Sequence, residues 1–486
     1  MKLCELCSKS GVSDYSMVGD AEVRRLVMDS RKVQPGDLFV AMPSVNSDSH
    51  SYISGALAAG AVGAVVHSLE ALELCRGASG LYLPDYENQL WRLCKTVTDN
   101  PTAAMKVVGV TGTNGKTTTA WIIRDMLQAL GVSSGYLGTL GLQYSGVSLE
   151  LPNTTPFVVD LYNYLADARD AGVQALAMEV SSHALAQKRV EGIEFDVAVM
   201  TNFTQDHLDF HGSLVEYAKA KRRIFSEFGP VFGCFNIDDS TAAGWHLAFE
   251  GPKIGYTAEG RPAAELKGIA TKVAIDGIEV TLTHAGETRT VRSQLAGNYN
   301  VSNLVSACSA LLGLGFTLDE VAQAIPKATP VPGRFESIAN DRGVGVIVDY
   351  AHTPDAIEKL LDAARALTDG RLITVFGCGG DRDGGKRPIM AAAASKRSDL
   401  TVITSDNPRT EDPSKILREV QAGIKSGKES VLIEDRVEAI LFAIGNAQKG
   451  DTVVIAGKGH EDYQIIGRTK IHLDDREIAR EALSAT

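Results

Sequence analysis

The sequence predicts an α/β protein of three domains: an N-terminal domain, a central P-loop domain built on a parallel sheet, and a C-terminal Rossmann-like domain. The chain has 486 residues, which is too long for one hydrophobic core and suggests about three domains of ordinary size. From about residue 101 onward, apolar runs of strand length alternate with helical segments, a pattern typical of parallel sheets covered by helices. A glycine-rich turn between the first of these strands and a helix completes the prediction.

The N-terminal domain is expected to span residues 1–100. Strand signals lie at residues 37–41 and 61–67. Asn100-Pro101 then marks a boundary, because the residue before a proline avoids helical geometry. Cys4 and Cys7 form a CxxC pair, but no further ligands lie nearby in the sequence. A structural zinc site needs four ligands. We therefore expect Cys4 and Cys7 to be two small apolar residues on an N-terminal helix and not zinc ligands.

The central domain is expected at residues 101–331 and the C-terminal domain at residues 332–486. Residues 328–333 contain two prolines and a glycine and are expected to form a hinge. In the central domain we expect strands at 106–110, 175–180 and 196–201, and helices at about 116–130 and 298–314. In the C-terminal domain we expect strands at 344–349, 372–377, 400–404 and 452–456, separated by helices.

Composition and charge favour a cytoplasmic enzyme that acts on small molecules. The net charge of −12 argues against bulk attraction to nucleic acid. The N-terminus lacks the pattern of a signal peptide, and the most apolar stretch, residues 56–66, is too short to span a membrane. The seven cysteines are an odd number without framework spacing, which favours a reducing compartment. We expect a monomer.

Residues 111–118, Thr-Gly-Thr-Asn-Gly-Lys-Thr-Thr, predict a phosphate-binding loop. They follow an apolar strand and open a helix, so backbone N–H groups and the helix N-terminus would face an anion. Lys116 would reach the outer phosphates of a nucleoside triphosphate, and Thr117 could bind Mg2+. A strict P-loop has glycine where this chain has Val110, so the turn must differ locally. A turn with no nucleotide role is the alternative.

Other strand ends of the central domain carry groups suited to metal and phosphate chemistry. Glu179 ends a buried strand, and because ligands bind beyond the carboxyl ends of parallel strands, we expect it near the phosphates as an oxygen ligand of Mg2+. An ordinary helix start with Ser181 as N-cap is the alternative. Residues 201–211 gather Asp and His side chains, including His207, and the basic run at 217–223 contains Lys221. A solvated helix face is the alternative for that run.

Three loops of the C-terminal domain, at residues 376–387, 405–410 and 456–464, combine charge with glycine after predicted strands. Parallel strands present their carboxyl ends at one edge of a sheet. The Arg, Asp, Asn, Lys, His and Glu side chains of these loops would therefore form a polar rim matched to a zwitterion. Any single one of them could be an ordinary loop.

Together these motifs resemble the Mur ligase family, the ATP-dependent amide-forming enzymes of peptidoglycan precursor synthesis. The resemblance covers nearly the whole chain and rests on residues 29–31, 111–118, 153–156, 179–185, 201–211, 295–300, 332–336, 349–354, 377–383, 406–409 and 457–461. It implies that the D-Glu γ-carboxylate of UDP-MurNAc-L-Ala-D-Glu attacks the ATP γ-phosphate, and that the amine of meso-diaminopimelate then attacks the acyl phosphate.

The resemblance also implies roles for individual residues. Those expected to bind ATP are Gly112, Thr113, Asn114, Gly115, Lys116, Thr117, Thr118, Asn300, Asn303 and Arg334. Those expected to bind the UDP-MurNAc-dipeptide are Met28, Ser30, Val45, Asn46, Ser47, Asn153, Thr154, Thr155, Ser181, Gln187 and Arg189. Those expected to bind diaminopimelate are Arg382, Asp406, Asn407, Pro408, Arg409, Gly457 and Glu461. The implied Mg2+ ligands are Thr117, Glu179, His207 and Lys221, and the catalytic set is Lys116, Glu179, His207 and Lys221.

Two of these implied roles have clear chemical consequences. Lys221 matches a family lysine that carries an N-carbamate, and a carbamate supplies oxygen ligands where an ammonium would repel Mg2+. Asp406 to Arg409 matches the family's diaminopimelate motif. Diaminopimelate differs from lysine by a second carboxylate, which the planar donors of Arg409 suit. Arg382 would share that work, and Asp406, Asn407 and Glu461 would take the distal ammonium.

Several alternatives remain at this stage. The enzyme alternatives are Mur ligases that add L-lysine, L-Ala, D-Glu or D-Ala-D-Ala, and folylpolyglutamate synthetase. The last has no reason to carry the motifs at residues 29–31 and 406–409, and amino-acid addition assays would separate the others. A nucleotide-gated binding protein without catalysis is disfavoured because all four catalytic candidates are present.

Overall fold

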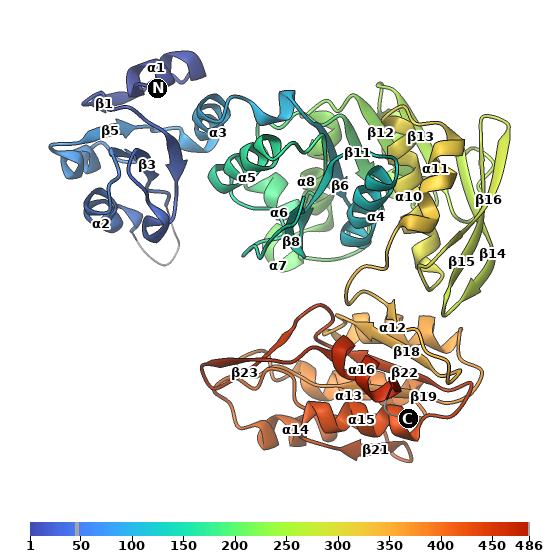
Figure 1. The fold of residues 1–486 in the computed structure, drawn as a ribbon. Helices are drawn as coiled ribbons and strands as arrows, with labels where there is room; N and C mark the ends of the chain where they lie inside the picture. Colours follow the sequence, from blue (N-terminus) through green and yellow to red (C-terminus); the bar gives the residue numbers. More distant parts are fainter. Residues whose placement is uncertain (44–47, 485–486) are drawn as a thin grey trace. The chain divides into compact units, whose positions relative to one another are not determined.

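The computed structural model describes residues 1–43 and 48–484 and divides the chain into two compact units. The first unit comprises residues 1–257, 261–266 and 306–321, and the second comprises residues 258–260, 267–305 and 322–486. In both units, helices flank the sheets (Figure 1), which confirms the predicted α/β class. Among the helices of the described ranges, none is long and apolar enough to cross a membrane.

The first unit begins with a small sheet in the order β1-β5-β4-β3-β2, parallel except for β1. Its strands are β1 (Ser16–Val18), β2 (Arg25–Val27), β3 (Asp37–Val40), β4 (Gly63–Val66) and β5 (Ser79–Tyr82), and its helices are α1 (Leu3–Ser10), α2 (Ile53–Ala58) and α3 (Tyr86–Val97). The two predicted strands correspond to β3 and β4. Cys4 and Cys7 lie on α1, where an N-terminal helix was expected, and Cys7 is buried whereas Cys4 is exposed.

The main sheet of the first unit has the order β13-β12-β11-β6-β10-β7-β8-β9. Its strands are β6 (Lys106–Thr111), β7 (Ser134–Gly138), β8 (Gly141–Tyr144), β9 (Val147–Leu149), β10 (Ala175–Glu179), β11 (Val197–Met200), β12 (Phe232–Asn236) and β13 (Lys253–Thr257). The helices are α4 (Lys116–Ala129), α5 (Val158–Asp170), α6 (Ser182–Ala186), α7 (Leu208–His211), α8 (Leu214–Ser226) and α9 (Ser240–Ala248). The strands from β13 to β7 pair in parallel, so β6, β10 and β11 end side by side.

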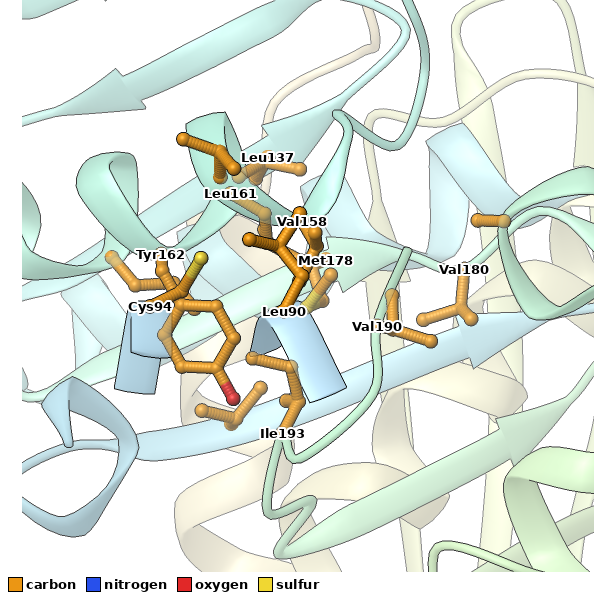
Figure 2. Close-up of a cluster of buried hydrophobic side chains, with 14 of the residues drawn as sticks. Leu90, Cys94, Leu137, Val158, Leu161, Tyr162, Met178, Val180, Val190 and Ile193 are labelled. Atoms are coloured by element: carbon orange, nitrogen blue, oxygen red, sulfur yellow. The ribbon is translucent and has the colours of Figure 1, made fainter. Parts of the chain in front are cut away.

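A continuous apolar core joins the small sheet region to the main sheet of the first unit. Leu90 and Cys94 of α3 lie beside Tyr162 of α5 and Ile193 (Figure 2), and all four are almost completely buried. The amphipathic pattern of α3 explains this packing, because Leu90, Leu93 and Cys94 recur on one face of the helix. This burial ties the N-terminal elements to the domain that carries the glycine-rich loop.

The second unit combines three antiparallel strands with a parallel sheet. The antiparallel strands are β14 (Leu266–Ala274), β15 (Gly277–His284) and β16 (Glu287–Ser293). They were not predicted, because apolar and polar side chains alternate along them in place of the continuous apolar runs of the parallel strands. Two helices, α10 (Tyr299–Gly313) and α11 (Leu318–Ala324), contribute residues to both units.

The other sheet of the second unit has the order β17-β18-β22-β19-β20-β21 and is parallel except for β17. Its strands are β17 (Glu336–Ser337), β18 (Gly345–Asp349), β19 (Leu372–Phe376), β20 (Leu400–Ile403), β21 (Glu429–Leu432) and β22 (Thr452–Ala456), followed by the hairpin β23 (Tyr463–Ile466) and β24 (Thr469–His472). The helices are α12 (Pro354–Arg365), α13 (Lys386–Arg397), α14 (Pro413–Gln421), α15 (Arg436–Asn446) and α16 (Asp475–Ser484). The order places β22, β19 and β20 next to one another, so the three predicted loops leave the sheet at one edge.

Candidate functional site

The glycine-rich loop leaves β6 at Thr111 and meets the N-terminus of α4 at Lys116. Gly112 and Gly115 have φ angles of 143° and 84°, which L side chains rarely adopt. A Cβ atom at Gly112 would also overlap the Thr201 hydroxyl. Val110, the departure from the strict motif, pairs inside the sheet with β10 and β11. The turn therefore starts at Gly112, two residues after the position where the strict motif has its first glycine. The loop still leads into a 14-residue helix whose N-terminus can face an anion.

Two lysines converge on the carbonyl of Gly112. The Lys116 Nζ donates to the Gly112 oxygen at 2.9 Å and to the Thr113 oxygen at 2.8 Å, and the Lys221 Nζ donates to the Gly112 oxygen at 2.6 Å. Lys221 is 1% exposed. Burial lowers the pKa of the Lys221 ammonium well below its ordinary value, and the charge of Lys116 acts in the same direction.

The predicted alternative of a solvated basic face on α8 is therefore wrong for Lys221. It holds for Lys219, whose side chain is 72% exposed. Arg223 is largely covered and pairs with Glu191 and Glu227. One helix thus combines ordinary surface charge with a buried amine at the phosphate-binding loop.

Glu179, at the end of β10, is a buried carboxylate surrounded by neutral donors. Its Oε2 accepts from the Thr117 hydroxyl at 3.0 Å and the Thr139 hydroxyl at 3.3 Å, and its Oε1 accepts from the Thr139 amide at 2.8 Å and from the Tyr136 hydroxyl. The side chain is 1% exposed. Within residues 1–43 and 48–484, no cationic side chain forms an ion pair with it. A buried anion without a counter-charge is costly, so this site suits a bound cation.

Several residues predicted to bind the dipeptide lie together beside Glu179. The Thr155 hydroxyl donates to the Glu179 carbonyl at 2.8 Å and lies 3.4 Å from the Ser181 hydroxyl. Arg189 donates to the Thr155 carbonyl at 2.9 Å and to the Gln187 side chain. The Thr154 hydroxyl lies 3.2 Å from that of Thr139. Ser181 is also the N-cap of α6, so the capping role weighed from the sequence is real and coexists with this cluster.

The remaining members of the predicted dipeptide site are dispersed. Asn153 is half-buried in the loop before α5, and Met28 and Ser30 are half-buried near the end of β2. Asp29 and Arg31 form an ion pair at 2.9 Å. Val45, Asn46 and Ser47 lie outside the described residues.

His207 belongs to an aromatic cluster at the start of α7. Its ring lies 4.7 Å from that of His183 and 6.3 Å from that of Tyr217, and its backbone is left-handed with φ of 50°. Burial lowers the pKa of His183 to about 4, and His207 and His211 act in the same direction. The Tyr217 ring also lies 4.7 Å from the Lys221 Nζ. The two predicted metal ligands therefore share a neighbour.

In the second unit, side-chain contacts join the loop at residues 405–410 to the loop at residues 456–464. The Asn407 amide donates to the Glu461 Oε2 at 3.0 Å, and the fully buried Lys458 ammonium lies 3.2 Å from the same oxygen. Gly457 has φ of 115°, and a Cβ there would lie 3.0 Å from the Asp406 Oδ2. Glycine is thus required where Asp406 approaches the end of β22.

Arg409 follows Pro408 with a left-handed backbone (φ of 51°). Its amide donates to the Ile465 carbonyl at 3.0 Å, and its carbonyl accepts from the Gly467 amide at 2.7 Å. Its half-buried guanidinium donates to the Gly380 carbonyl at 2.8 Å and pairs with no carboxylate in the described part of the chain. Arg382 is exposed on the adjacent loop, likewise without an ion pair among the described residues.

The residues outside the glycine-rich loop that are predicted to bind ATP lie in the second unit. The Asn300 amide donates to the Ala296 carbonyl at 2.7 Å, and the Asn303 amide donates to the Asn300 oxygen at 2.9 Å. Arg334 lies over the Tyr350 ring at 4.9 Å, and its buried Nε has no hydrogen-bond partner among the residues that the structure describes.

Sequence reasoning missed several residues that shape these sites. Tyr136 and Thr139 contact Glu179, and Arg387, which is 2% exposed, pairs with Glu411 and Glu419 beneath the loop of Arg382. Arg436 donates to the carbonyls of Ser405 and Ala456. Their signal was weak, because each acts through partners distant in the sequence. Arg387 is the last residue of the predicted loop at 376–387, but its burial could not be read from the sequence.

Comparison with known proteins identifies the family. The Mur ligase middle domain matches residues 110–311, and the Mur ligase, glutamate ligase domain matches residues 333–459. The chain is 45% identical over 490 aligned residues, covering 100% of its length and 98% of the relative, to the UDP-N-acetylmuramoyl-L-alanyl-D-glutamate--2,6-diaminopimelate ligase of Gloeobacter violaceus. The chain belongs to the Mur ligase family. This Mur ligase is also 41% identical, over 99% of both chains, to the protein of the same name from Geobacillus thermodenitrificans.

A solved structure supports the assignment at the level of the fold. A structure titled as a UDP-N-acetylmuramoyl-L-alanyl-D-glutamate--2,6-diaminopimelate ligase aligns with 95% of this chain and 95% of its own, at 34% identity and a TM-score of 0.70. The predicted family and its three-domain α/β architecture are therefore confirmed. The domain boundaries and the roles of single residues stay predictions.

Proposed function

We propose that this Mur ligase adds meso-diaminopimelate to UDP-MurNAc-L-Ala-D-Glu at the expense of ATP, through an acyl-phosphate intermediate. Two relatives, at 41% and 45% identity over nearly the full length, are named as ligases that join these two substrates. The observation that carries the choice of amino acid is Arg409. Its half-buried guanidinium uses one donor on the Gly380 carbonyl and leaves further donors for a carboxylate of the substrate.

The charges around Arg409 suit the rest of a diamino acid. We assign the distal carboxylate to Arg409 and Arg382, and the distal ammonium to Asp406 and Glu461. Lys458, 3.2 Å from Glu461, partly offsets the two acidic groups and holds Glu461 in place. L-lysine would leave the Arg409 guanidinium without a partner, and such a mismatch commonly discriminates by orders of magnitude.

The first half-reaction uses the glycine-rich loop. The amides from Gly112 to Thr118 and the α4 N-terminus bind the phosphates, and Lys116 stabilises charge on the transferring phosphoryl group. In the described structure the Lys116 ammonium is folded back onto two loop carbonyls, so it can exchange those acceptors for phosphate oxygens. Asn300, Asn303 and Arg334 are assigned to the remainder of the nucleotide.

The donor set beside the loop fits Mg2+. Glu179 is a buried carboxylate without an ion pair in the described ranges, and the Thr117 hydroxyl already lies 3.0 Å from it. We assign one cation to Thr117 and Glu179 and a second to His207 and a carbamate on Lys221. When bound, such ions would neutralise charge on the phosphoryl group.

Two features of Lys221 support its modification. Its burial and lowered pKa favour the neutral amine, which is the form that reacts with CO2. The carbamate would supply oxygen ligands where the ammonium would repel a cation.

The dipeptide end of the second substrate is assigned to the cluster beside Glu179. Thr154, Thr155 and Ser181 offer hydroxyls, and Arg189 offers a guanidinium held by Gln187 and stacked 4.1 Å from the Phe157 ring. These donors would hold the D-Glu carboxylate for attack on the γ-phosphate. Asn153, Met28 and Ser30, together with residues 45–47, are assigned to the nucleotide-sugar end.

A substrate-competition assay tests the proposal. Phosphate release is measured with UDP-MurNAc-L-Ala-D-Glu and either meso-diaminopimelate or L-lysine. We expect use of diaminopimelate, and Arg409→Ala should lower its kcat/KM by about a hundredfold or more with the KM for ATP little changed. Arg418→Ala is the matched control, because Arg418 is an exposed arginine of the same unit. Equal or better use of L-lysine by the unaltered enzyme would overturn the proposal.

A further inference from the structure

Tyr136 is a buried polar residue that none of the roles above uses. It lies on β7, is fully buried, and its ring packs edge-on against Trp121 at 5.5 Å. Its hydroxyl accepts a hydrogen bond from the Leu140 amide at 3.3 Å and contacts the Glu179 Oε1. The hydroxyl has a single proton, and it donates this proton to the Glu179 Oε1 while the Leu140 amide donates to the phenol oxygen. Tyr136 is therefore a fixed donor to the carboxylate.

The hydrogen bonds of Glu179 distinguish its two oxygens. Oε1 is held by Tyr136 and by the Thr139 amide at 2.8 Å, which are both rigid groups of β7 and the turn after it. Oε2 is approached by two hydroxyls, those of Thr117 at 3.0 Å and Thr139 at 3.3 Å. Side-chain hydroxyls can rotate away, whereas the buried phenol and the backbone amide cannot. The arrangement thus immobilises one oxygen and leaves the other available.

Gly138 supplies the space for this contact. A Cβ atom at this position would overlap both the Glu179 Oε1 and the Tyr136 hydroxyl. The backbone of Gly138 is not left-handed, so an alanine would be excluded by the two side chains rather than by its own conformation. The glycine and the tyrosine act together on the same carboxylate oxygen.

We propose that Tyr136 is a positioning residue for Glu179: its hydroxyl holds Oε1 so that Oε2 faces Thr117 and the cation bound there. This inference rests on the proposed function, since it assigns a divalent cation to Thr117 and Glu179. Partners that orient a metal ligand contribute to metal affinity, and their loss typically costs about 10–100-fold. A tyrosine with a merely structural hydroxyl would affect stability and leave cation affinity unchanged.

The test compares two Tyr→Phe variants of the full-length enzyme. Tyr136→Phe removes the hydroxyl from Glu179. Tyr162→Phe is the matched control, because Tyr162 is also fully buried in the first unit and donates to a backbone carbonyl, that of Glu191, at 3.1 Å. The readout is the dissociation constant of Mn2+ in the presence of ADP, measured by electron paramagnetic resonance, together with the thermal midpoint.

We expect Tyr136→Phe to weaken Mn2+ binding about tenfold and to raise the Mg2+ concentration for half-maximal turnover, with the KM for diaminopimelate unchanged. Tyr162→Phe should bind Mn2+ as the unaltered enzyme does. Gly138→Ala should weaken Mn2+ binding at least as much as Tyr136→Phe, because the added Cβ atom would displace the Glu179 Oε1. Wild-type Mn2+ affinity in Tyr136→Phe, with stability lowered as in Tyr162→Phe, would overturn the inference. Failure of the proposed function would instead appear as absent phosphate release in the unaltered enzyme.

Discussion

The buried ion pair between Arg436 and Asp475 offers a sharp test of how the second unit builds its amino-acid site. Both side chains are 0% exposed, and the guanidinium makes two hydrogen bonds of 2.7 Å to the carboxylate. The same guanidinium donates to the carbonyls of Ser405 at 3.2 Å and Ala456 at 3.0 Å. These carbonyls immediately precede Asp406 and Gly457. The pair therefore joins two strand ends that carry the proposed diaminopimelate site.

The magnitude follows from the burial. Removing one partner leaves the other charge uncompensated in the interior, which typically costs about 3–5 kcal/mol. Arg436→Met and Asp475→Leu should each lower the stability of the second unit by about that amount. The double variant leaves no charge buried, so its loss should be far smaller than the sum of the two single losses. A domain stability of about 5–15 kcal/mol exceeds this loss except at its lower limit, so the single variants are best studied at low temperature.

The double variant separates stability from function. Because Ser405 and Ala456 lose their shared donor, we expect its KM for diaminopimelate to rise about tenfold, on the scale found when a supporting partner is lost, while its KM for ATP stays unchanged. Stability should be followed by hydrogen exchange of the β20 and β22 amides. Tryptophan fluorescence would not serve, because Trp91, Trp121 and Trp245 all lie in the first unit.

An exposed pair is the control for this experiment. Arg365 and Asp399 lie 2.6 Å apart, with side chains 38% and 46% exposed, and Arg365→Met should cost less than about 1 kcal/mol. A loss below about 1 kcal/mol for Arg436→Met would refute the reasoning. So would an unchanged KM for diaminopimelate in the double variant.

Three further outcomes are expected. Lys221→Ala should nearly abolish turnover, and Lys221→Arg should not restore it, because a guanidinium cannot become an oxygen ligand; an active arginine variant in the phosphate-release assay would contradict the carbamate. Lys116→Ala should remove phosphoryl transfer yet bind the nucleotide-sugar substrate in calorimetry, and near-normal ATP hydrolysis would contradict the loop assignment. Burial lowers the pKa of His460 from 6.5 to about 4. As the pH falls, the unfolded chain therefore binds a proton at this histidine before the folded chain does. The free energy of unfolding should fall by at most about 3 kcal/mol between pH 6.5 and 4. His460→Gln should flatten that dependence in urea titrations, and an unchanged slope would contradict it.

The site residues that could be predicted from the sequence lie in short contiguous segments. The loop at residues 111–118, the end of β10 at Glu179 and the three loops of the C-terminal sheet each follow an apolar strand, and the structure places all of them at strand ends. The three C-terminal loops were expected at one edge of a parallel sheet, and the sheet order adds that their strands β22, β19 and β20 are neighbours. The antiparallel strands β14 to β16 were not predicted, because they carry many polar side chains and no continuous apolar run.

Lys221 marks the limit of sequence reasoning from the residues alone. The basic residues around Lys221 on α8 have the spacing of an ordinary solvated helix face. The contact that shows Lys221 to be a buried amine at the phosphate-binding loop is with Gly112, 109 residues away in the sequence. Burial is a property of the packed chain, since it depends on which other elements cover the helix.

The amino-acid sequence by itself determined the α/β class, the strand ends that carry the chemistry and, through the resemblance of its motifs, the family. Tertiary structure alone decided which charges are paired and which are not. Glu179 lacks a counter-ion and Arg409 lacks a carboxylate within the described residues, whereas Arg387 and Arg436, equally charged in sequence, form buried ion pairs with acidic partners. The physical reason is that an ion pair forms only between groups that the fold brings within a few ångströms and removes from water.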